Sequence, residues 1–568
     1  MRVVLVWQAD PAATYAWVPP SGPGDAVVSF DALAAQELDE CGARNFDDLI
    51  GWEQRSAAQH HVARLVACLR DDEALATRGF DGHALGPFVE FRARAEFAHV
   101  LRGFSAGLAL GGAARSLVED PALPAAVGLG ARAALGLDVE HARYLPDVPA
   151  VKPEPLKRLG ANAAMRTLAA ATPVRNVRVA AVLNARVAPA ITALPRAQLR
   201  AAGLGAMPFP GLDYGNSARL AARLRIPFLA TLDPVRTRRA TCPELGAGPA
   251  FPGEDPRLAT ALRRVTRGLV EVSWPRLVEA AYAVRGLRRA RDLRALVLPT
   301  TAVGASRLLM DWAHRRGIAV ASVQHGVYGF REHDGGDSRA DVLFAWSERV
   351  GEQALAWPQP RPRIVAVGVP GMACPPARPP AHGPPRRVLV ATTGRPIESA
   401  LGTTSFHEQF IAVIAPGLRT LMHAGVRVEL RLHPLEDRLV YRRILAGLSL
   451  DVPFAAAEPL PDAIRRAELL VAAPSSVAFE AGVLGAPVLV WTGGTPLAIR
   501  QEHLLAPLSL DLPGMFGDAA QFQTLTRGLV AEGAPTLAMG RALAAQLGSY
   551  ARPFDAGRFG QGLVELAG

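Results

Sequence analysis

The stretch that decides the fold runs from Glu468 to Trp491 and reads ELLVAAPSSVAFEAGVLGAPVLVW. Its opening apolar residues, 469–471, are typical of a buried parallel strand. Pro474 ends this strand, and Ser475 and Ser476 stand where a helix should begin, because serine is a favoured N-cap residue. The stretch therefore begins as a strand that turns directly into a helix.

The second half of the stretch predicts how this helix ends. It should continue to about Leu484 and stop at Gly485, since glycine suits a C-cap position. Residues 486–491 then form another apolar strand. A strand, a tight turn, a helix and a strand in succession indicate an α/β fold, with small residues where the helix packs on the sheet.

The start of this helix is a candidate phosphate-binding site. Its unpaired backbone N–H groups and the positive end of the helix dipole favour an anion, and the hydroxyls of Ser475 and Ser476 add donors. Glu480 lies one turn after Ser476 on the same face, where a carboxylate suits ribose hydroxyls. The alternative is an ordinary capped helix in an α/β sheet. Polar residues at the ends of the neighbouring strands would favour the phosphate-binding interpretation.

Composition excludes several functional classes. The 568 residues suffice for two or three domains, and 50% of them are hydrophobic, which allows a large core. The formal net charge of +10 comes from a chain whose positive residues are nearly all arginine. These arginines are scattered rather than gathered into a basic tract with aromatic residues, so we expect no nucleic-acid partner.

Cysteine spacing and hydropathy bear on location. The four cysteines, Cys41, Cys68, Cys242 and Cys374, form no Cys-x-x-Cys pair, which fits a reducing cytosol. The N-terminus turns polar too early for a signal peptide, and no apolar run reaches the ~18 residues of a membrane span. We expect a cytoplasmic protein. Peripheral contact with the cytoplasmic face of the inner membrane is the alternative.

Alternating strand and helix patterns divide the chain into two halves. Strand patterns near 295–299, 318–323, 341–346 and 363–367 predict one parallel sheet, and those from 387 onward predict another. We therefore expect an α/β protein of two Rossmann-like, doubly wound domains that face a cleft. The expected organisation is an acceptor-side domain over 1–373 with a mostly helical insertion at about 31–290, a Pro-rich linker over 374–386, a nucleotide-donor domain over 387–535 and a helical tail over 536–568. Within the insertion, 177–183 and 227–232 are compatible with short strands.

Further polar stretches fall at predicted strand ends. Gln324-His325-Gly326 ends a strand of the first half, and Arg431-Leu432-His433-Pro434 ends a strand of the second. Carboxyl ends of parallel strands meet at one edge of a sheet, so an imidazole and a helix N-terminus should converge there and suit a nucleotide phosphate. The predicted donor-nucleotide site comprises Thr392, Thr393, Gly394, Arg395, Arg431, His433, Pro434, Ser475, Ser476 and Glu480.

This combination resembles the two-domain GT-B glycosyltransferases of bacterial surface and capsular polysaccharide synthesis. It is most similar to those that use CMP-activated sugars, the Kdo transferases of capsule export systems and the bacterial sialyl- and polysialyltransferases. In such enzymes a His-Pro motif and a Ser-Ser motif bind CMP, and the matching positions here are His433-Pro434 and Ser475-Ser476. Gln324-His325-Gly326 resembles the Gln-His-Gly of capsule-type proteins and the Trp-His-Gly of CDP-glycerol transferases of teichoic acid synthesis. The resemblance covers about residues 290–500.

The resemblance implies a glycosyltransferase that moves a sugar, such as Kdo or sialic acid, from a CMP-sugar to a glycan or lipid-linked acceptor of the capsule, lipopolysaccharide or another part of the cell envelope. Fixed hydrogen-bond donors would stabilise the leaving phosphate. We therefore expect a metal-independent reaction, with the nucleotide-sugar as substrate and no further cofactor. The absence of an Asp-x-Asp sequence agrees with this expectation. The resemblance also implies contact with a polysaccharide export complex as an alternative to a freely cytoplasmic enzyme.

The reaction also needs a base that deprotonates the acceptor hydroxyl. The candidates are His325, Asp10, Asp233 and Asp334. His325 has the best position, at a strand end that faces the crevice, and the alternative is a turn residue that packs the interdomain face. The sialyltransferases hold their base in an acidic-acidic-Gly motif, which Glu254-Asp255 and Asp334-Gly335-Gly336 each match only in part.

Three other functions fit parts of the pattern. A CDP-glycerol or CDP-ribitol phosphotransferase would share the nucleotide site, a sugar-nucleotide 2-epimerase would share the two domains, and a non-catalytic polysaccharide assembly protein would keep the fold alone. The long irregular N-terminal half argues against the epimerase. His60-His61 predicts no metal site, because adjacent helical side chains point about 100° apart and make poor joint ligands.

Overall fold

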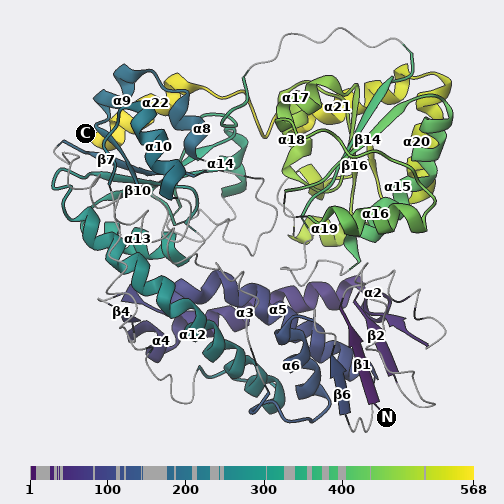
Figure 1. Ribbon diagram of the computed structural model, residues 1–568, viewed down its shortest axis with the longest axis horizontal. Coiled ribbons are helices and arrows are strands. Elements are labelled where there is room, and N and C mark those ends of the chain that lie inside the picture. The colour runs from purple at the N-terminus through teal and green to yellow at the C-terminus, as the bar shows by residue number, and fades with distance from the viewer. Residues whose placement is uncertain are drawn as a thin grey trace.

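The computed structural model describes most of the chain. The described residues are 2–7, 26–30, 35, 38, 42–77, 79–80, 83–110, 116–119, 123–142, 144, 176–184, 187–207, 214–229, 242, 249–301, 304–324, 326, 339–354, 361–373, 383–394, 405–434, 436–503 and 507–568. They form three parallel sheets, the helices that cover them and one short antiparallel hairpin (Figure 1). No helix in this part of the chain is long and apolar enough to cross a membrane.

Five parallel strands form the sheet of the C-terminal domain, which we define as residues 387–548. They are β13 (Arg387–Ala391), β14 (Arg427–Arg431), β15 (Leu469–Ala472), β16 (Val488–Trp491) and β17 (Met515–Phe516). Their order is β14-β13-β15-β16-β17, so the chain places its second strand on one side of the first and all later strands on the other. The residues of β15 and β16 are all buried, as apolar runs covered on both faces should be.

Helices cover both faces of this sheet, which is therefore doubly wound. One face carries α15 (Phe406–His423), α16 (Arg438–Gly447) and α20 (Ala519–Ala531), and the other carries α17 (Leu460–Arg466), α18 (Ser476–Val483) and α21 (Ala534–Gly548). The helix predicted after Pro474 is α18, and its predicted limits are confirmed. Gly485 after it has a φ of +64°, a left-handed conformation that glycine adopts without strain.

Six parallel strands form the sheet of the middle domain, which we define as residues 176–373. They are β7 (Val179–Val182), β8 (Leu204–Met207), β9 (Ala295–Leu298), β10 (Ala319–Val323), β11 (Val342–Ala345) and β12 (Arg363–Ala366), in the order β12-β11-β10-β9-β7-β8. One face packs against α5 (Gly86–Leu110), α12 (Pro256–Leu287) and α13 (Gly304–His314). The other packs against α8 (Val187–Thr192), α9 (Arg196–Ala201), α10 (Tyr214–Leu224) and α22 (Ala556–Ala567). The predicted α/β class with two doubly wound parallel sheets is confirmed.

A third sheet belongs to the N-terminal unit, which we define as residues 2–142. It contains β1 (Arg2–Val6), β2 (Ala26–Ser29), β3 (Arg44–Asn45) and β6 (Ser116–Glu119), in the order β3-β2-β1-β6. The unit also contains α2 (Phe46–Leu49), α3 (Trp52–Asp71), α4 (Glu73–Thr77), α6 (Ala125–Ala134) and the hairpin of β4 (Gly79–Phe80) and β5 (His83–Ala84). In Figure 1 its purple elements lie along one side of the other two domains.

The N-terminal organisation differs from the sequence expectation. The acceptor-side domain was expected to span 1–373, whereas β1 lies with β2, β3 and β6 in a sheet apart from the middle sheet. The region of about 31–290 was expected to be a mostly helical insertion, but β7 and β8 within it complete the middle sheet. β7 lies within 177–183, so the short strand predicted there is confirmed, whereas β8 was not predicted because its four residues include glycine and alanine and give a weak strand pattern. The remaining domain limits stay predictions.

The two C-terminal helices pack on different domains. α21 packs on the sheet of its own domain, whereas α22 returns to the middle domain, where Phe559 and Leu563 enter the core. The return is anchored by a parallel bridge between Val369 and Pro553. The expected single helical tail is thus one covering helix and one crossover helix.

Candidate nucleotide-binding site

The predicted site residues of the C-terminal domain meet at one edge of its sheet. Ala391 at the end of β13 lies opposite Arg431 of β14 on one side and Ala472 of β15 on the other. The loops that follow these three strands therefore leave the sheet side by side. The strand order reverses between β13 and β15, and in such sheets ligands bind outside the carboxyl ends at this switch point.

The N-terminus of α18 lies at this edge of the sheet and can bind an anion. Ser475 has an extended backbone, with φ −153° and ψ 156°, and its side chain caps the helix by accepting from the Val477 N–H at 3.5 Å. Ser475 and Ser476 are both partly exposed, so their hydroxyls can reach a ligand. The predicted cap is confirmed, and the helix dipole adds partial positive charge at this point.

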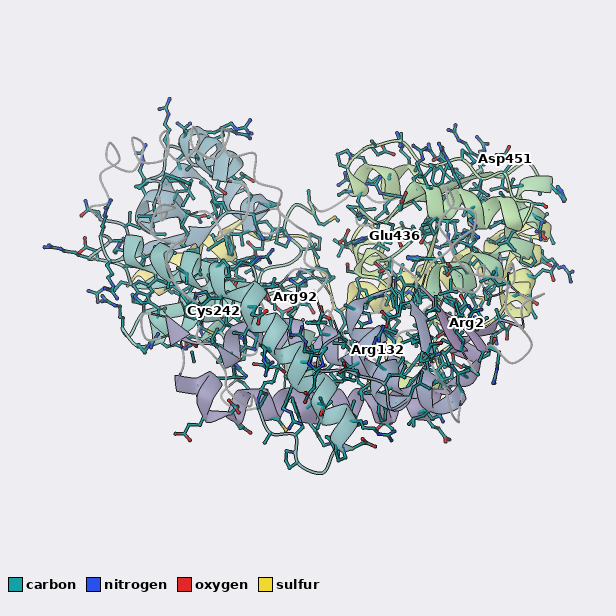
Figure 2. All side chains as sticks on the ribbon, turned by 60° about the horizontal axis from the view of Figure 1, so that its bottom comes forward. Arg2, Arg92, Arg132, Cys242, Glu436 and Asp451 are labelled. Atoms are coloured by element: carbon teal, nitrogen blue, oxygen red, sulfur yellow. The ribbon has the colours of Figure 1, made fainter. Side chains whose placement is uncertain are left out.

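The loop after β14 holds His433 through its backbone. The His433 N–H donates to Glu436 Oε2 at 2.7 Å and lies 2.9 Å from Thr392 Oγ1. The Thr392 hydroxyl also donates to the Glu436 carboxylate. The loops after β13 and β14 are thus tied together by one acidic side chain, which Figure 2 labels in the C-terminal domain.

The Glu436 carboxylate is itself fixed from the other side. The Tyr441 hydroxyl donates to Glu436 Oε1 at 2.9 Å and lies 2.7 Å from His407 Nδ1. His407 Nδ1 is 3.2 Å from the same carboxylate oxygen. Burial and the adjacent Glu436 carboxylate raise the pKa of Tyr441 well above its ordinary value, so its hydroxyl stays protonated and can donate. This buried network sets the position of the His433 loop.

The His433 ring faces the loop that follows β13. A Cβ added at Gly394 would lie 3.5 Å from His433 Nδ1 and 3.7 Å from its Cε1. Burial lowers the pKa of His433, so the ring is neutral at pH 7 and can donate one N–H to a phosphate. Thr393 and Gly394 are partly exposed beside it. The loops after β13 and β14 therefore lie next to each other at Gly394 and His433.

Arg431 and Glu480 are two further predicted residues of the site. The Arg431 guanidinium donates to the Glu458 carbonyl at 2.8 Å, so its position is fixed by the backbone. Burial raises the pKa of Glu480 to about 7. Among the described residues, no cation offsets this effect of burial on Glu480. Glu480 lies on the same helix face as Ser476, and its ionised form can accept from ribose hydroxyls.

Three site residues escaped the sequence analysis, namely His407, Glu436 and Tyr441. Glu436 stands three residues after His433, and its own N–H donates to the His433 carbonyl at 2.9 Å, which closes a tight turn. An acid at this spacing after a strand-ending histidine was the available signal. His407 and Tyr441 carry no comparable signal, because each lies within an amphipathic helix.

The structure does not describe the predicted catalytic residues. Asp10, Asp233, His325 and Asp334 lie outside the described residues, as does Arg395 of the nucleotide site. Gln324, directly before His325, is buried and accepts from the Trp346 N–H at 2.7 Å through its Oε1. Its amide nitrogen donates to the Gly326 carbonyl at 2.9 Å. The end of β10 is therefore fixed on both sides of position 325.

Comparisons with known proteins give distant likenesses in structure. No protein-family model and no curated protein sequence matches the chain. UDP-GlcNAc 2-epimerase from Neisseria meningitidis, bound to UDP-GlcNAc, is similar with a TM-score of 0.38 and 11% identity, over 68% of this chain and 98% of that chain. Anabaena HepE, in complex with UDP and glucose, also gives 0.38 and 11%, over 68% and 98%. The wall teichoic acid polymerase TagF gives 0.31 and 14%, over 51% of this chain and 74% of that chain. At such identities a likeness does not identify an activity, so the function rests on the residues of the site.

Proposed function

We propose that the chain is a GT-B glycosyltransferase of bacterial surface polysaccharide synthesis. It would move a sugar from a nucleotide-activated donor to a glycan or lipid-linked acceptor. The observation that carries this proposal is the meeting of the α18 N-terminus, the His433 ring and the Gly394 loop at the switch point of a doubly wound sheet. A nucleotide phosphate suits this set of donors, and Glu480 suits the ribose.

The same groups account for the chemistry of the leaving group. When the bond between sugar and phosphate breaks, negative charge develops on the phosphate. The hydroxyls of Ser475 and Ser476, the α18 dipole and the neutral His433 ring would stabilise that charge without reorganising. This role needs no metal ion at the donor phosphate, so we propose a metal-independent reaction.

The acceptor side would be supplied by the middle domain. His325, Asp10, Asp233 and Asp334 remain the candidate bases. His325 is favoured because Gln324 fixes the end of β10 next to it through Trp346 and Gly326. Closure of the two domains around the donor would exclude water and limit donor hydrolysis.

We favour a CMP-sugar such as CMP-Kdo or CMP-sialic acid as the donor. Support comes from the His-Pro and Ser-Ser positions, His433-Pro434 and Ser475-Ser476, which match the motifs of CMP-sugar-dependent enzymes. The Glu436 carboxylate accepts from the His433 N–H and so holds the backbone of this histidine in place.

Product analysis tests this proposal. The full chain is incubated with a glycan or lipid-linked acceptor and, in separate reactions, with CMP-Kdo, CMP-sialic acid, CDP-glycerol or UDP-GlcNAc, and nucleotide products are separated by chromatography. We expect release of CMP from a CMP-sugar, and at least tenfold slower release by His433→Ala. Release of CMP only from CDP-glycerol would indicate a polyol phosphotransferase instead of a glycosyltransferase. Epimerised UDP-GlcNAc would indicate an epimerase. No product from any donor would contradict an enzymatic role with these donors.

A further inference from the structure

A second group of polar side chains lies where the C-terminal domain contacts the N-terminal unit. The helix α19 (Leu497–His503) lies against α3 of the N-terminal unit. His60 of α3 and Glu502 and His503 of α19 each turn one ligand atom to the same point, and these atoms all lie within 4.8 Å of one another. The group shares no residue with the nucleotide site, and metal binding there is independent of the proposed function.

The distances within this group suit a metal ion. His60 Nε2 is 3.4 Å from Glu502 Oε1, and His503 Nε2 is 3.8 Å from Glu502 Oε2. Ligand atoms about 2.0–2.1 Å from a tetrahedral Zn²⁺ lie about 3.4 Å from one another. Two imidazoles and one carboxylate form a common ligand set for Zn²⁺, with a fourth position left for water.

The hydrogen bonding of His60 prepares its ring for a metal. His60 Nδ1 lies 2.9 Å from the Ser56 carbonyl oxygen, which can only accept, so Nδ1 carries the hydrogen. In the neutral ring this leaves the lone pair on Nε2, which faces the Glu502 carboxylate. A divalent cation between this nitrogen and the carboxylate oxygen would bind both. A backbone carbonyl that holds the second ring nitrogen is the usual outer partner of a metal-bound histidine.

His503 supplies the buried side of the group. Its side chain is only 2% exposed, whereas those of His60 and Glu502 are each 48% exposed. His503 Nε2 is held 2.7 Å from the Ser56 hydroxyl, which can rotate away when a metal takes the nitrogen. The site is thus buried at His503, in the contact between α3 and α19, and open to solvent at His60 and Glu502. An ion can enter from the open side.

We propose that His60, Glu502 and His503 bind a divalent cation of the Zn²⁺ class and so link the N-terminal unit to the C-terminal domain. Imidazole nitrogen favours Zn²⁺ over Mg²⁺ or Ca²⁺, which prefer all-oxygen sites. His60 and His61 were predicted to make poor joint ligands. His61 pairs instead with Glu254, at 2.7 Å between Nε2 and Oε2. The second histidine of the site comes instead from a distant part of the chain.

Zn²⁺ titration of the full chain tests this site. The protein is stripped with a chelator, transferred to chelator-free buffer and titrated with Zn²⁺ in a calorimeter, and its melting temperature is measured with and without Zn²⁺. We expect one Zn²⁺ per chain and a higher melting temperature with Zn²⁺, because the ion binds the folded state. Mg²⁺ at the same concentration should produce neither effect.

Matched variants locate the ion. His60→Ala and Glu502→Gln change half-exposed side chains and should leave the fold intact, but each should weaken Zn²⁺ binding at least tenfold. His61→Ala is the control, since it removes the adjacent histidine that faces Glu254, and its Zn²⁺ affinity should equal that of the wild type. The proposal is overturned if the wild type binds no Zn²⁺, or if His61→Ala weakens binding as much as His60→Ala.

Discussion

At the scale of single residues, Glu480 links the site to stability. A carboxyl group whose pKa is raised from 4.5 to about 7 holds its proton more tightly in the folded chain than in the unfolded chain. Its contribution to stability is therefore present at low pH and is lost as the pH rises through the range from about 4.5 to 7. A residue that weakens the fold at neutral pH is expected where function needs a carboxylate.

The corresponding prediction concerns Glu480→Gln. Glutamine does not ionise, so the variant should match the wild type near pH 4 and exceed its free energy of unfolding at pH 8 by up to about 3 kcal/mol. Urea unfolding at both pH values measures the difference. The same variant should bind nucleotide several-fold more weakly, because ribose hydroxyls donate more strongly to a charged acceptor. An equal stability difference at both pH values would contradict the assigned environment of Glu480.

Glu436 gives a second prediction at this scale. Glu436→Ala leaves the buried donors of Thr392, His433 and Tyr441 without their common acceptor, so we expect a loss of about 2–3 kcal/mol of stability and at least tenfold weaker nucleotide binding. Tyr441→Phe is the control. It removes one hydroxyl but keeps the bonds to the His433 loop, so it should cost about 1 kcal/mol and change nucleotide affinity less than twofold. Equal effects of both changes on affinity would show that Glu436 does not position His433.

Sequence patterns predicted which residues of the site stand at strand ends, but not what supports them. Ser475 and His433 were predictable because a strand that ends in Pro474 or Pro434 fixes where the polar residues fall. The contact of His407 with Tyr441 was not, since it joins two helices whose packing no local pattern encodes.

At the scale of elements, α15 depends on a residue of another unit. Its N-cap residue Ser405 makes no side-chain cap of its own. The carboxylate of Asp47, from α2, accepts instead from the Ser405 N–H at 2.8 Å, and Arg55 of α3 holds that carboxylate at 2.7 Å in a buried ion pair. A carboxylate at this position also complements the helix dipole. Because His407 follows two residues later, the N-terminal unit helps to position the network behind His433.

This arrangement predicts a large effect of Asp47→Ala. The change removes the acceptor of the Ser405 N–H and the carboxylate that pairs with the buried Arg55 at 2.7 Å, which should cost about 3–5 kcal/mol. Asp48→Ala, an exposed neighbour on the same helix, should change stability by less than about 0.5 kcal/mol. Denaturant unfolding of both variants checks this. If Asp47→Ala were as stable as Asp48→Ala, the contact between α2 and α15 would be unimportant.

At this scale, strands with a clear apolar pattern were predictable from the sequence, and a strand without one was not. β13, β15 and β16 are runs of large apolar residues, and their predicted positions are confirmed. β8 contains only Leu, Gly, Ala and Met, so no strand was predicted there, and its place beside β7 depends on the packing of the whole middle sheet.

At the scale of the whole molecule, the chain consists of two doubly wound domains and an N-terminal unit that contacts both. The large core beneath the middle sheet includes residues of α3, α5 and α12, so the N-terminal helices and the middle sheet share one core. The N-terminal unit reaches the C-terminal domain through Ser405 and through α19. Composition and strand periodicity predicted the two sheets, but they contain no information on which sheet the first strand joins, because that depends on contacts distant in sequence.

The central claim is that the C-terminal domain binds a nucleotide at the switch point between β13 and β15. The most direct test is the melting temperature of the full chain with CMP, CDP, UDP, GDP and ADP in turn, since a ligand that binds the folded state raises it. We predict a rise with CMP or CDP that is lost in His433→Ala and Ser476→Ala but retained in His423→Ala, which removes an exposed histidine at the opposite end of α15. No rise with any nucleotide, or a rise that survives both site substitutions, would contradict the claim.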